Sequence, residues 1–308
     1  MDPITNKLLF QPFTHKIGED EAIVRPSTTY WQDAWRRLKM NKGAMIGLVI
    51  VFIMLVLAIF GPYLTPYTYD AQQLTTEYTN LPSSAEHWFG TDDLGRDLFT
   101  RVWHGARVSL LIGFVSAIVQ FLIGVTYGGI SGYLGGWVDE IMMRIVEVLS
   151  GIPFLLYVVL LMVVLEPGLT TILIALGAVY WLSMARLVRG QVLALKEQEY
   201  VLAARALGAS QWRIIFRHLI PNCMGPILVY STLAIPEAIF AEAWLSFLGL
   251  GVSAPAASLG MLVSDGISSI RLYPGQLFYP AFFISLTILA FNIFGDGLRD
   301  ALDPRLRK

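Results

Sequence analysis

The residues best placed to do chemistry in this sequence are the charged side chains that interrupt its apolar runs. Many of them gather in one stretch, "EYVLAARALGASQWRIIFRHLIPN", which begins at Glu199 and ends at Asn222. The sequence contains no Ser/His/Asp or Cys/His arrangement, its histidines are too scattered for a metal site, and no Gly-x-x-x-x-Gly-Lys-Ser/Thr phosphate loop occurs. These charges therefore indicate docking and binding, and we expect ATP to be bound elsewhere than on this chain.

The composition indicates an integral membrane protein. Hydrophobic residues make up 55% of the 308 residues and charged residues only 15%, with a mean hydropathy of +0.60. Soluble domains carry about 25% charged residues, so this chain lacks the polar surface that water requires. The single cysteine, Cys223, excludes an internal disulfide, and no basic-aromatic surface suggests a nucleic-acid partner.

Six segments of the sequence approach the length of about 20 apolar residues that a helix needs to cross a bilayer. Only "EPG" (Glu166 to Gly168) separates the third from the fourth, where a tight turn at the membrane surface favours two spans over one long buried helix. The sequence therefore predicts an all-α membrane protein with six transmembrane helices, over residues 44–64, 108–130, 143–165, 169–187, 224–244 and 278–295.

The distribution of lysine and arginine predicts the orientation of these spans. Six spans place both termini on one side, and that side has 18 of the 22 Lys and Arg residues. The other side has Arg96, Arg101, Arg107 and Arg271. We expect the basic side to be cytoplasmic, with the N-terminal segment 1–43, the 188–223 connection and the 296–308 tail. The extracellular side then holds the loops 65–107 and 245–277.

Residues 30–42, "YWQDAWRRLKMNK", have the pattern of a helix that lies in the membrane interface. Trp31, Ala34, Trp35 and Leu38 recur at helical spacing, with Arg and Lys between them. Tryptophan lies among lipid headgroups while cations face outward. The alternative is that this segment extends the first span. No apolar run precedes the first span, so we expect that span to act as its own insertion signal.

The stretch from Glu199 to Asn222 has helical character but is too polar to cross the membrane. The helix formers from Ala203 to Leu207 are followed by Gly208, a residue that often ends a helix or permits close backbone approach. A second amphipathic piece follows, and we expect Pro221 to close it before the fifth span. The pattern predicts a cytoplasmic helix–Gly–helix unit that presents small residues to a docking protein. The alternative is an ordinary helical loop.

The same stretch resembles the cytoplasmic coupling motif of ABC importer permeases, which reads Glu-Ala-Ala, three residues, Gly, and Ile-x-Leu-Pro nine residues further on. Ala203 and Ala204 stand at its Ala positions, Gly208 at its Gly, and Ile220-Pro221 at its close. The resemblance implies that this unit docks into a cleft of a partner ATPase. The residues implied in that contact are Glu199, Ala203, Ala204, Arg205, Gly208, Ala209, Ile220 and Pro221.

This sequence departs from the motif at two positions. Leu202 stands where the motif has Glu, and His218 stands where it has Ile. Glu199, three residues earlier, is a candidate source of the missing charge. The ionic details of the docking therefore do not follow from the motif.

Three further segments narrow the resemblance to one subfamily. They are similar to the C-type subunit of oligopeptide and dipeptide permeases, and the likeness runs from about Trp31 to the C-terminus. The resemblance implies the type I ABC importer permease fold, with a permease domain over about 105–297. The segments are "HWFGTDDLGRDLFTRVWHGARVSLLIG" (His87 to Gly113), "GLGVSAPAASLGMLVSDG" (Gly249 to Gly266) and "FNIFGDGLRDALDPRLRK" (Phe291 to Lys308).

The resemblance also implies a five-part importer in a bacterial plasma (inner) membrane. The other parts are a homologous second permease, two ATPases or two copies of one, and an extracellular solute-binding protein that delivers a peptide. ATP and Mg²⁺ belong to the ATPases, and this chain is expected to have no catalytic residue, metal or cofactor. Related permeases carry nickel or glutathione, so these substrates stay open. The rival class is a self-sufficient secondary transporter, which predicts an internal repeat that the two halves do not show.

The predicted extracellular sequence "GTDDLGRD" is rich in charge. Asp92, Asp93, Arg96 and Asp97 either form ion pairs that fix the loop, with glycines at its turns, or contact the binding protein. The nearby arginine argues against a metal site formed by the three aspartates.

Two carboxylates lie inside the fifth predicted span, Glu237 near its middle and Glu242 nearer its outer end. A carboxylate in hydrocarbon is costly, so it normally faces a cavity or a partner. Our hypothesis is that one of the two lines the peptide path, where it can meet a peptide's ammonium group. The alternative is a hydrogen bond to a neighbouring helix.

Overall fold

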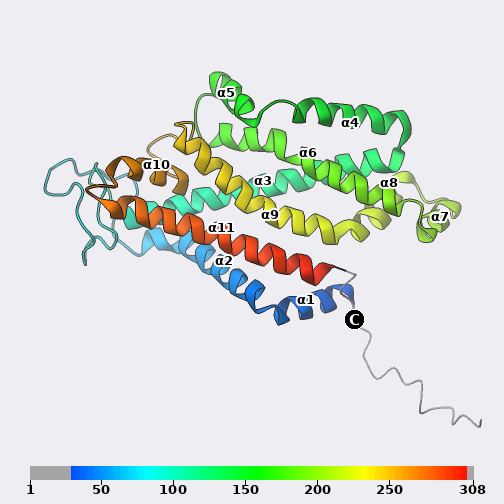
Figure 1. The fold of residues 1–308 in the computed structure, drawn as a ribbon, viewed down its shortest axis with the longest axis horizontal. Coiled ribbons are helices and arrows are strands. Elements are labelled where there is room, and N and C mark those ends of the chain that lie inside the picture. Colours follow the sequence, from blue (N-terminus) through cyan, green and yellow to red (C-terminus); the bar gives the residue numbers. More distant parts are fainter. Residues whose placement is uncertain (1–28, 304–308) are drawn as a thin grey trace, which may run out of the picture.

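The computed structural model describes residues 29–303, and the regular elements in this part of the chain are helices (Figure 1). Among them, five are long and apolar enough to cross a membrane, and the bent pair α4–α5 makes a sixth span if it counts as one. This architecture confirms the predicted all-α membrane fold. The long helices are α2 (Lys42–Phe60), α3 (Leu98–Leu134), α6 (Leu169–Leu195), α9 (Ile220–Phe247) and α11 (Pro274–Leu302). The shorter ones are α1 (Tyr30–Met40), α4 (Gly136–Ser150), α5 (Phe154–Leu165), α7 (Glu199–Ala206), α8 (Gln211–Arg213) and α10 (Leu259–Ser269).

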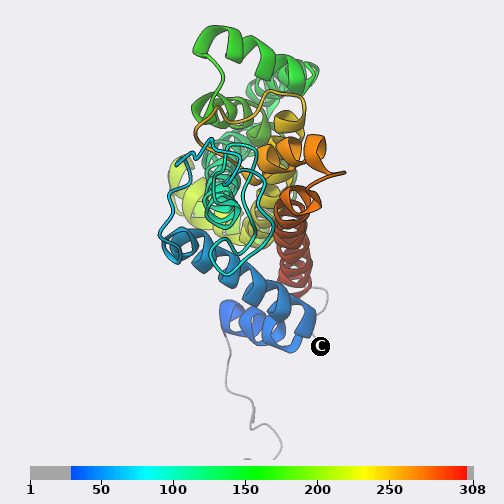
Figure 2. The same cartoon turned by 90° about the vertical axis from the view of Figure 1, so that its left-hand side faces the viewer.

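The segment predicted as the third span, residues 143–165, is divided between two helices. α4 ends at Ser150 and α5 begins at Phe154, and the two helices are bent by 80° relative to each other. Pro153 stands at the break, where its ring and its missing N–H prevent a helix from continuing. Figures 1 and 2 both show α4 and α5 beside α6, on the side away from α2 and α11. The apolar run therefore does not form one straight helix.

Several helices extend beyond the predicted spans because capping groups set their ends. α3 begins at Leu98 rather than near residue 108, since the Asp97 carboxylate accepts the Thr100 N–H at 2.8 Å. α11 continues to Leu302, so the first part of the predicted tail is helical. The predicted loop 245–277 contains α10, whose N-terminus is capped by Ser258.

The centre of the bundle is the close packing of α3 against α6. A Cβ atom on Gly128 would lie 2.3 Å from the carbonyl oxygen of Ala185, and one on Gly124 would lie 2.6 Å from the Met184 Cβ. Only glycine allows two helix backbones to approach so closely. This contact makes α3 and α6 a closely packed pair. α9 and the coupling segment pack against that pair.

The amphipathic segment before the first span is a separate helix, α1, rather than an extension of α2. Asn41 ends α1, and its side chain accepts the Ala44 N–H at 3.1 Å to begin α2. α1 buries Leu38 against the end of α11, and leaves Trp31 and Trp35 about half exposed. Its tryptophans are therefore free to lie among lipid headgroups, as the interfacial interpretation requires.

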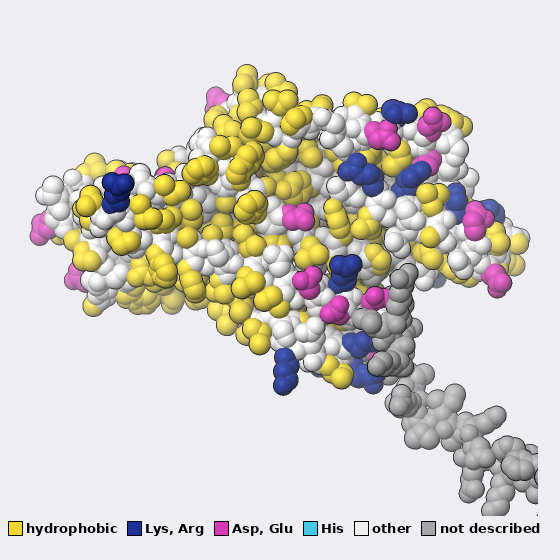
Figure 3. Space-filling view, viewed as in Figure 1, with side chains coloured by type: hydrophobic (Ala, Val, Ile, Leu, Met, Phe, Trp, Pro, Cys, Tyr) yellow, Lys and Arg dark blue, Asp and Glu magenta, His cyan; other side chains and the backbone are white. Residues whose placement is uncertain are grey.

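The two ends of the bundle differ in what they contain. Residues 64–97 and α10 gather at one end, which we call the loop end, while α1, α7 and α8 lie at the other, which we call the coupling end (Figure 1). On the face drawn in Figure 3, hydrophobic side chains cover the middle, and most Lys and Arg side chains lie toward the coupling end. The charge separation in the sequence is thus also a separation in space.

Candidate coupling surface and translocation groove

The stretch from Glu199 to Asn222 begins as the predicted helix–Gly–helix unit. α7 ends at Ala206, Gly208 adopts a φ of +80°, and α8 starts after Ser210, whose side chain accepts the Arg213 N–H. A residue with a Cβ is disfavoured at this φ, which explains the glycine at the turn. The helix–Gly–helix prediction is confirmed in this respect.

The tip of this unit is open to its surroundings. Glu199, Ala203, Arg205, Gly208 and Pro221 are exposed, whereas Ala204 and Ala209 are half-buried. The most exposed large apolar side chain of the described residues is Leu207, at 89% exposure, directly beside Gly208. We did not single it out from the sequence, where a leucine next to helix formers resembles any core residue. This exposure places an apolar side chain at the tip of the unit, beside the turn that the coupling motif marks.

The opposite side of the unit is anchored. Val201, Ile214 and Leu219 are buried in a cluster with Met184, Val188 and Val192 of α6. Ile220, which the motif placed at the docking contact, is also buried in this cluster. The guanidinium of Arg205 lies over the ring of Tyr133 at 5.8 Å, so this cation also faces α3. The unit is therefore held rigidly, and Ile220 has an anchoring position rather than an exposed one.

Pro221 does not close the second piece, contrary to our expectation. Residues Ile214–Leu219 form a π-helix, the Ile220 N–H donates to the Ile215 carbonyl, and α9 follows without a break. Pro221 lies in the first turn of α9, where its missing N–H is tolerated, and the wider π turn before it accommodates its ring. The result is one continuous helical segment from Gln211 to Phe247, with Pro226 and Pro236 inside α9.

The predicted extracellular charges mostly form internal ion pairs. Asp92 accepts from Arg96 Nε at 2.7 Å and lies 3.4 Å from Arg101 Nε, while Asp97 lies 2.8 Å from the His87 Nδ1. Arg101 and Asp97 are buried, so these pairs lie inside the folded loop end. The loop-fixing alternative therefore describes Asp92, Arg96 and Asp97.

Asp93 and two glycines are the remaining residues of interest in the charged loop motif. The Asp93 side chain is 71% exposed and forms a long ion pair of 4.0 Å with Arg96 Nη2, so it is the one exposed charge of the four. Gly90 and Gly95 have φ values of +81° and +69°, and a Cβ on either would lie 2.2 Å from a carbonyl oxygen. Both glycines stand at turns, as the sequence predicts.

The two carboxylates of α9 lie in different surroundings. Glu242 is fully buried and accepts hydrogen bonds from the hydroxyls of Ser246 and Ser258, the second of which caps α10. Glu237 is exposed, and the contact near it is a 3.4 Å hydrogen bond from the Tyr180 hydroxyl to its backbone carbonyl. The hydrogen-bonded alternative thus describes Glu242, and Glu237 remains the candidate for the path.

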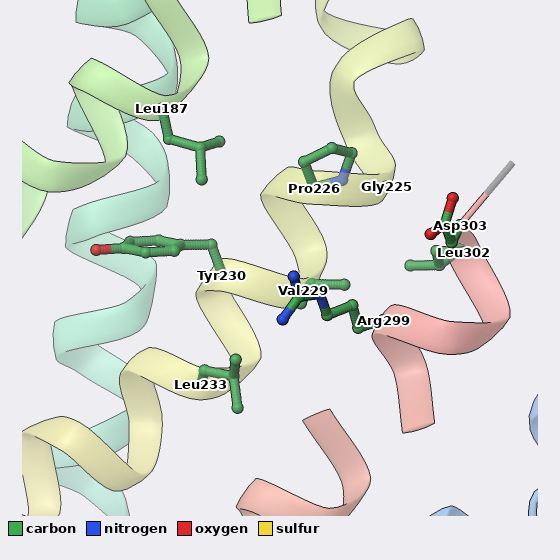
Figure 4. Close-up of a pocket in the computed structure, with 9 residues that line it drawn as sticks. All are labelled: Leu187, Gly225, Pro226, Val229, Tyr230, Leu233, Arg299, Leu302 and Asp303. Atoms are coloured by element: carbon green, nitrogen blue, oxygen red, sulfur yellow. The ribbon is translucent and has the colours of Figure 1, made fainter. Parts of the chain in front are cut away.

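Near the coupling end, a cavity of about 440 Å³ lies between α9, Leu187 of α6 and the end of α11 (Figure 4). Leu233 lines this cavity, and Glu237 follows it by one helical turn on the same face. The lining of the cavity is mostly apolar and includes Arg299 and the carboxylate of Asp303, whereas Glu237 is not among the lining residues.

Comparisons of the sequence with known proteins identify its family. Residues 124–308 match the family described as the binding-protein-dependent transport system inner membrane component, and residues 29–82 match the N-terminal TM domain of oligopeptide transport permease C. The chain is 57% identical over 294 residues to the dipeptide transport system permease protein DppC of Bacillus subtilis, covering 95% of this chain and 91% of the relative. It is 53% identical over 302 residues to the oligopeptide transport system permease protein OppC of Bacillus subtilis, covering 98% of each.

The fold also resembles a solved structure. A chain of the MetNI methionine ABC transporter, in an inward-facing conformation, superposes with a TM-score of 0.54 at 19% identity. The match covers 65% of this chain and 94% of that one. The likeness concerns the fold alone, which is the type I permease fold of ABC importers.

Proposed function

Because this chain belongs to the family of binding-protein-dependent transport system inner membrane components, we propose that it is the permease subunit through which an ATP-driven importer carries oligopeptides or dipeptides. The observation that carries the proposal is the exposed turn at Gly208, followed by a helical segment that continues into the cavity-lining helix α9. Likeness to two peptide permeases over nearly the whole chain supports the substrate class.

The proposed partners are those that this geometry needs. Two ATPases, or two copies of one, bind ATP and Mg²⁺ and receive the tip around Leu207 and Gly208, since the sequence has no phosphate loop of its own. A homologous second permease covers the side of α9 on which Glu237 is exposed in this chain. An extracellular solute-binding protein delivers the peptide at the loop end. In this scheme the chain is not an enzyme.

The proposed motion follows from the continuity of the helical segment that leads into α9. ATP binding draws the partner ATPases together and displaces the coupling tip, and α9 tilts because it belongs to the same helical segment, Gln211–Phe247. The tilt opens the path toward the binding protein, and hydrolysis resets it. Nucleotide binding thus biases an equilibrium between two states.

The proposed orientation places both termini in the cytoplasm of a bacterial cell. The coupling end has most of the lysine and arginine, which accumulate on the cytoplasmic side of membranes. Of the four arginines toward the loop end, Arg96 and Arg101 are buried near Asp92 and present little charge to the surface. Their burial strengthens the charge asymmetry that the sequence shows.

The first test is to purify the chain gently from its native membrane and identify the subunits that accompany it. A second permease and one or two P-loop ATPases are expected. Recovery of the chain alone, or only with copies of itself, contradicts the proposal and favours the alternative that the chain is a self-sufficient secondary transporter.

The second test uses a matched pair of glycine variants. Gly208→Asp is expected to abolish uptake and ATPase co-purification while the subunit stays in the membrane, because the added carboxylate blocks the docking cleft. Gly249→Asp is the control, since Gly249 has a φ of +77° against +80° for Gly208 and neither has an atom within 4 Å of an added Cβ. Gly249 lies at the loop end, so its variant is expected to transport. Normal uptake by Gly208→Asp, or equal loss in both variants, rules out the docking assignment.

A further inference from the structure

The side chain of Glu242 is a fully buried titratable group that the proposed function leaves without a role. Two hydroxyls, those of Ser246 and Ser258, donate to its Oε1 atom. Its Oε2 atom is buried and has no hydrogen-bond partner among residues 29–303. An ionised carboxylate is an acceptor at both oxygens, whereas a protonated one carries a hydrogen on one of them. The contacts of Glu242 therefore match a neutral carboxyl group, with Oε1 as its carbonyl oxygen and the proton on Oε2.

The ionisable side chains of the neighbouring helices are engaged elsewhere. They are Arg101, His104 and Arg107 on α3, Asp265 on α10, Glu237 on α9 itself and Tyr180 on α6. Arg101 pairs with Asp92, and Arg107 donates to two carbonyl oxygens of α2. His104 stacks on Tyr69 with their ring centroids 3.8 Å apart, and Asp265 lines a separate polar cavity. Tyr180 donates to the backbone carbonyl of Glu237, whose own side chain is exposed.

No cation of the described residues therefore forms an ion pair with Glu242. The connection 248–258, which leads from α9 to α10, has no ionisable residue that could supply one. Burying an unpaired charge costs far more than burying a neutral, hydrogen-bonded group, so a carboxyl in such a site takes up a proton instead. The charge balance around Glu242 and its hydrogen bonds thus indicate the same neutral state.

Helix α10 is the cover that keeps Glu242 away from water. A Cβ on Gly260 would lie 3.1 Å from Glu242 Oε2 and 2.4 Å from the Cα of Ala243, so the α10 backbone lies directly against this oxygen. Ser258, which donates to Oε1, also caps α10 by accepting the Met261 N–H at 3.0 Å. Separation of α10 from α9 would remove the cover and this donor together and admit water to Oε2. In water a glutamic acid is ionised at neutral pH.

We propose that Glu242 is a proton-dependent latch at the loop end: its neutral carboxyl group holds α10 against α9, and its proton passes to water when α10 separates from α9. Each separation releases one proton and each return takes one up. The closed arrangement is therefore favoured as the pH falls, and a rise in pH favours separation by up to about tenfold per pH unit. The latch acts whatever solute the chain transports.

The first test is infrared spectroscopy of the chain, with the subunits that accompany it, in lipid nanodiscs at neutral pH. A protonated carboxylic acid has a C=O stretching band that an ionised carboxylate lacks. The difference spectrum between the wild type and Glu242→Gln is expected to contain this band. Glu147→Gln is the matched control, because Glu147 is an exposed carboxylate that pairs with Arg144 at 2.8 Å on α4, so its removal is expected to leave the band in place. Absence of an acid band that depends on Glu242 overturns the inference.

The second test is hydrogen exchange of the α10 amides in the same particles. The ratio of the wild-type exchange rate to that of Glu242→Gln is expected to rise up to about tenfold per pH unit between about pH 6 and pH 8, since only the wild type releases a proton on separation. Glu147→Gln is expected to behave as the wild type. A ratio that does not change with pH shows that separation of α10 is not linked to a proton, and overturns the inference. Failure of Glu242→Gln to assemble also overturns it, because a neutral amide of the same shape should replace a neutral carboxyl.

Discussion

Glu237 and Glu242 are five residues apart on α9, and the structure gives them opposite surroundings. Five residues rotate a side chain by about 140° around a helix. Glu242 is consequently enclosed between α9 and α10, whereas Glu237 is exposed on another side of α9. The surroundings of a carboxylate in a span therefore depend on its helical phase as well as on its depth.

The surroundings of Glu242 join three helices at the loop end. Its carboxylate accepts from Ser258, and the next residue, Leu259, donates its N–H to the Ser109 hydroxyl of α3 at 3.1 Å. A Cβ on Gly260 would lie 2.4 Å from the Cα of Ala243, so α10 contacts the backbone of α9. Glu242 thus fixes α10 against α3 and α9.

Removing Glu242 is expected to have the largest effect on stability. Glu242→Ala should lower the free energy of unfolding by about 2–4 kcal/mol, since it leaves a cavity and two serine hydroxyls without their acceptor. Glu242→Gln keeps the shape and one acceptor oxygen, and should cost less. Thermal melting of the purified complex measures both. A wild-type melting temperature for Glu242→Ala would show that the buried network is not stabilising.

Neutralising Glu237 is expected to affect transport without affecting stability. Glu237→Gln should lower peptide uptake about tenfold, corresponding to about 1.4 kcal/mol, because the exposed face of α9 loses its carboxylate. The melting temperature should stay at the wild-type value, since the Glu237 side chain has no hydrogen bond to a described residue. Normal uptake with normal assembly would remove Glu237 from the path, and a lowered melting temperature would make it a second structural carboxylate.

Ser258→Ala is expected to have a smaller effect on stability than Glu242→Ala. The substitution removes one donor to Glu242 and the cap of α10, and a lost helix cap costs about 1 kcal/mol. Uptake should remain close to normal because Ser258 does not line the cavity on α9. A melting temperature as low as that of Glu242→Ala would mean that the cap, rather than the carboxylate, is the main stabilising group.

Tyr180→Phe is expected to have the smallest effect. The hydroxyl donates to the Glu237 carbonyl at 3.4 Å, close to the limit for a hydrogen bond, and at an exposed position. The expected change in the free energy of unfolding is below about 0.5 kcal/mol, in the range of ordinary surface substitutions. A larger loss, measured by the same melting experiment, would show that the exposed side of α9 is anchored more firmly than its contacts indicate.

The sequence predicted the helical fold, the membrane class and the turn at Gly208, because these depend on local information. Apolar length defines a span, and a glycine between helix formers marks a turn. The resemblance likewise identified the family from motifs spread over the chain. The expectation for Pro221 was wrong for a reason that lies outside local rules, since a π turn and the burial of Ile214 and Ile215 in a cluster with residues of α3 and α6 let the helix continue.

The sequence by itself thus determined that this chain forms membrane helices, where its coupling turn lies and which residues have charge within the spans. Only the tertiary structure decided that Glu242 is enclosed, that Ile220 is an anchor, that Leu207 is the exposed tip, and that Arg299 reaches the cavity on α9. The physical reason is that hydropathy and spacing are properties of one segment. The direction in which a side chain points depends on how that helix is rotated against its neighbours, and this rotation is set by packing between residues far apart in the chain.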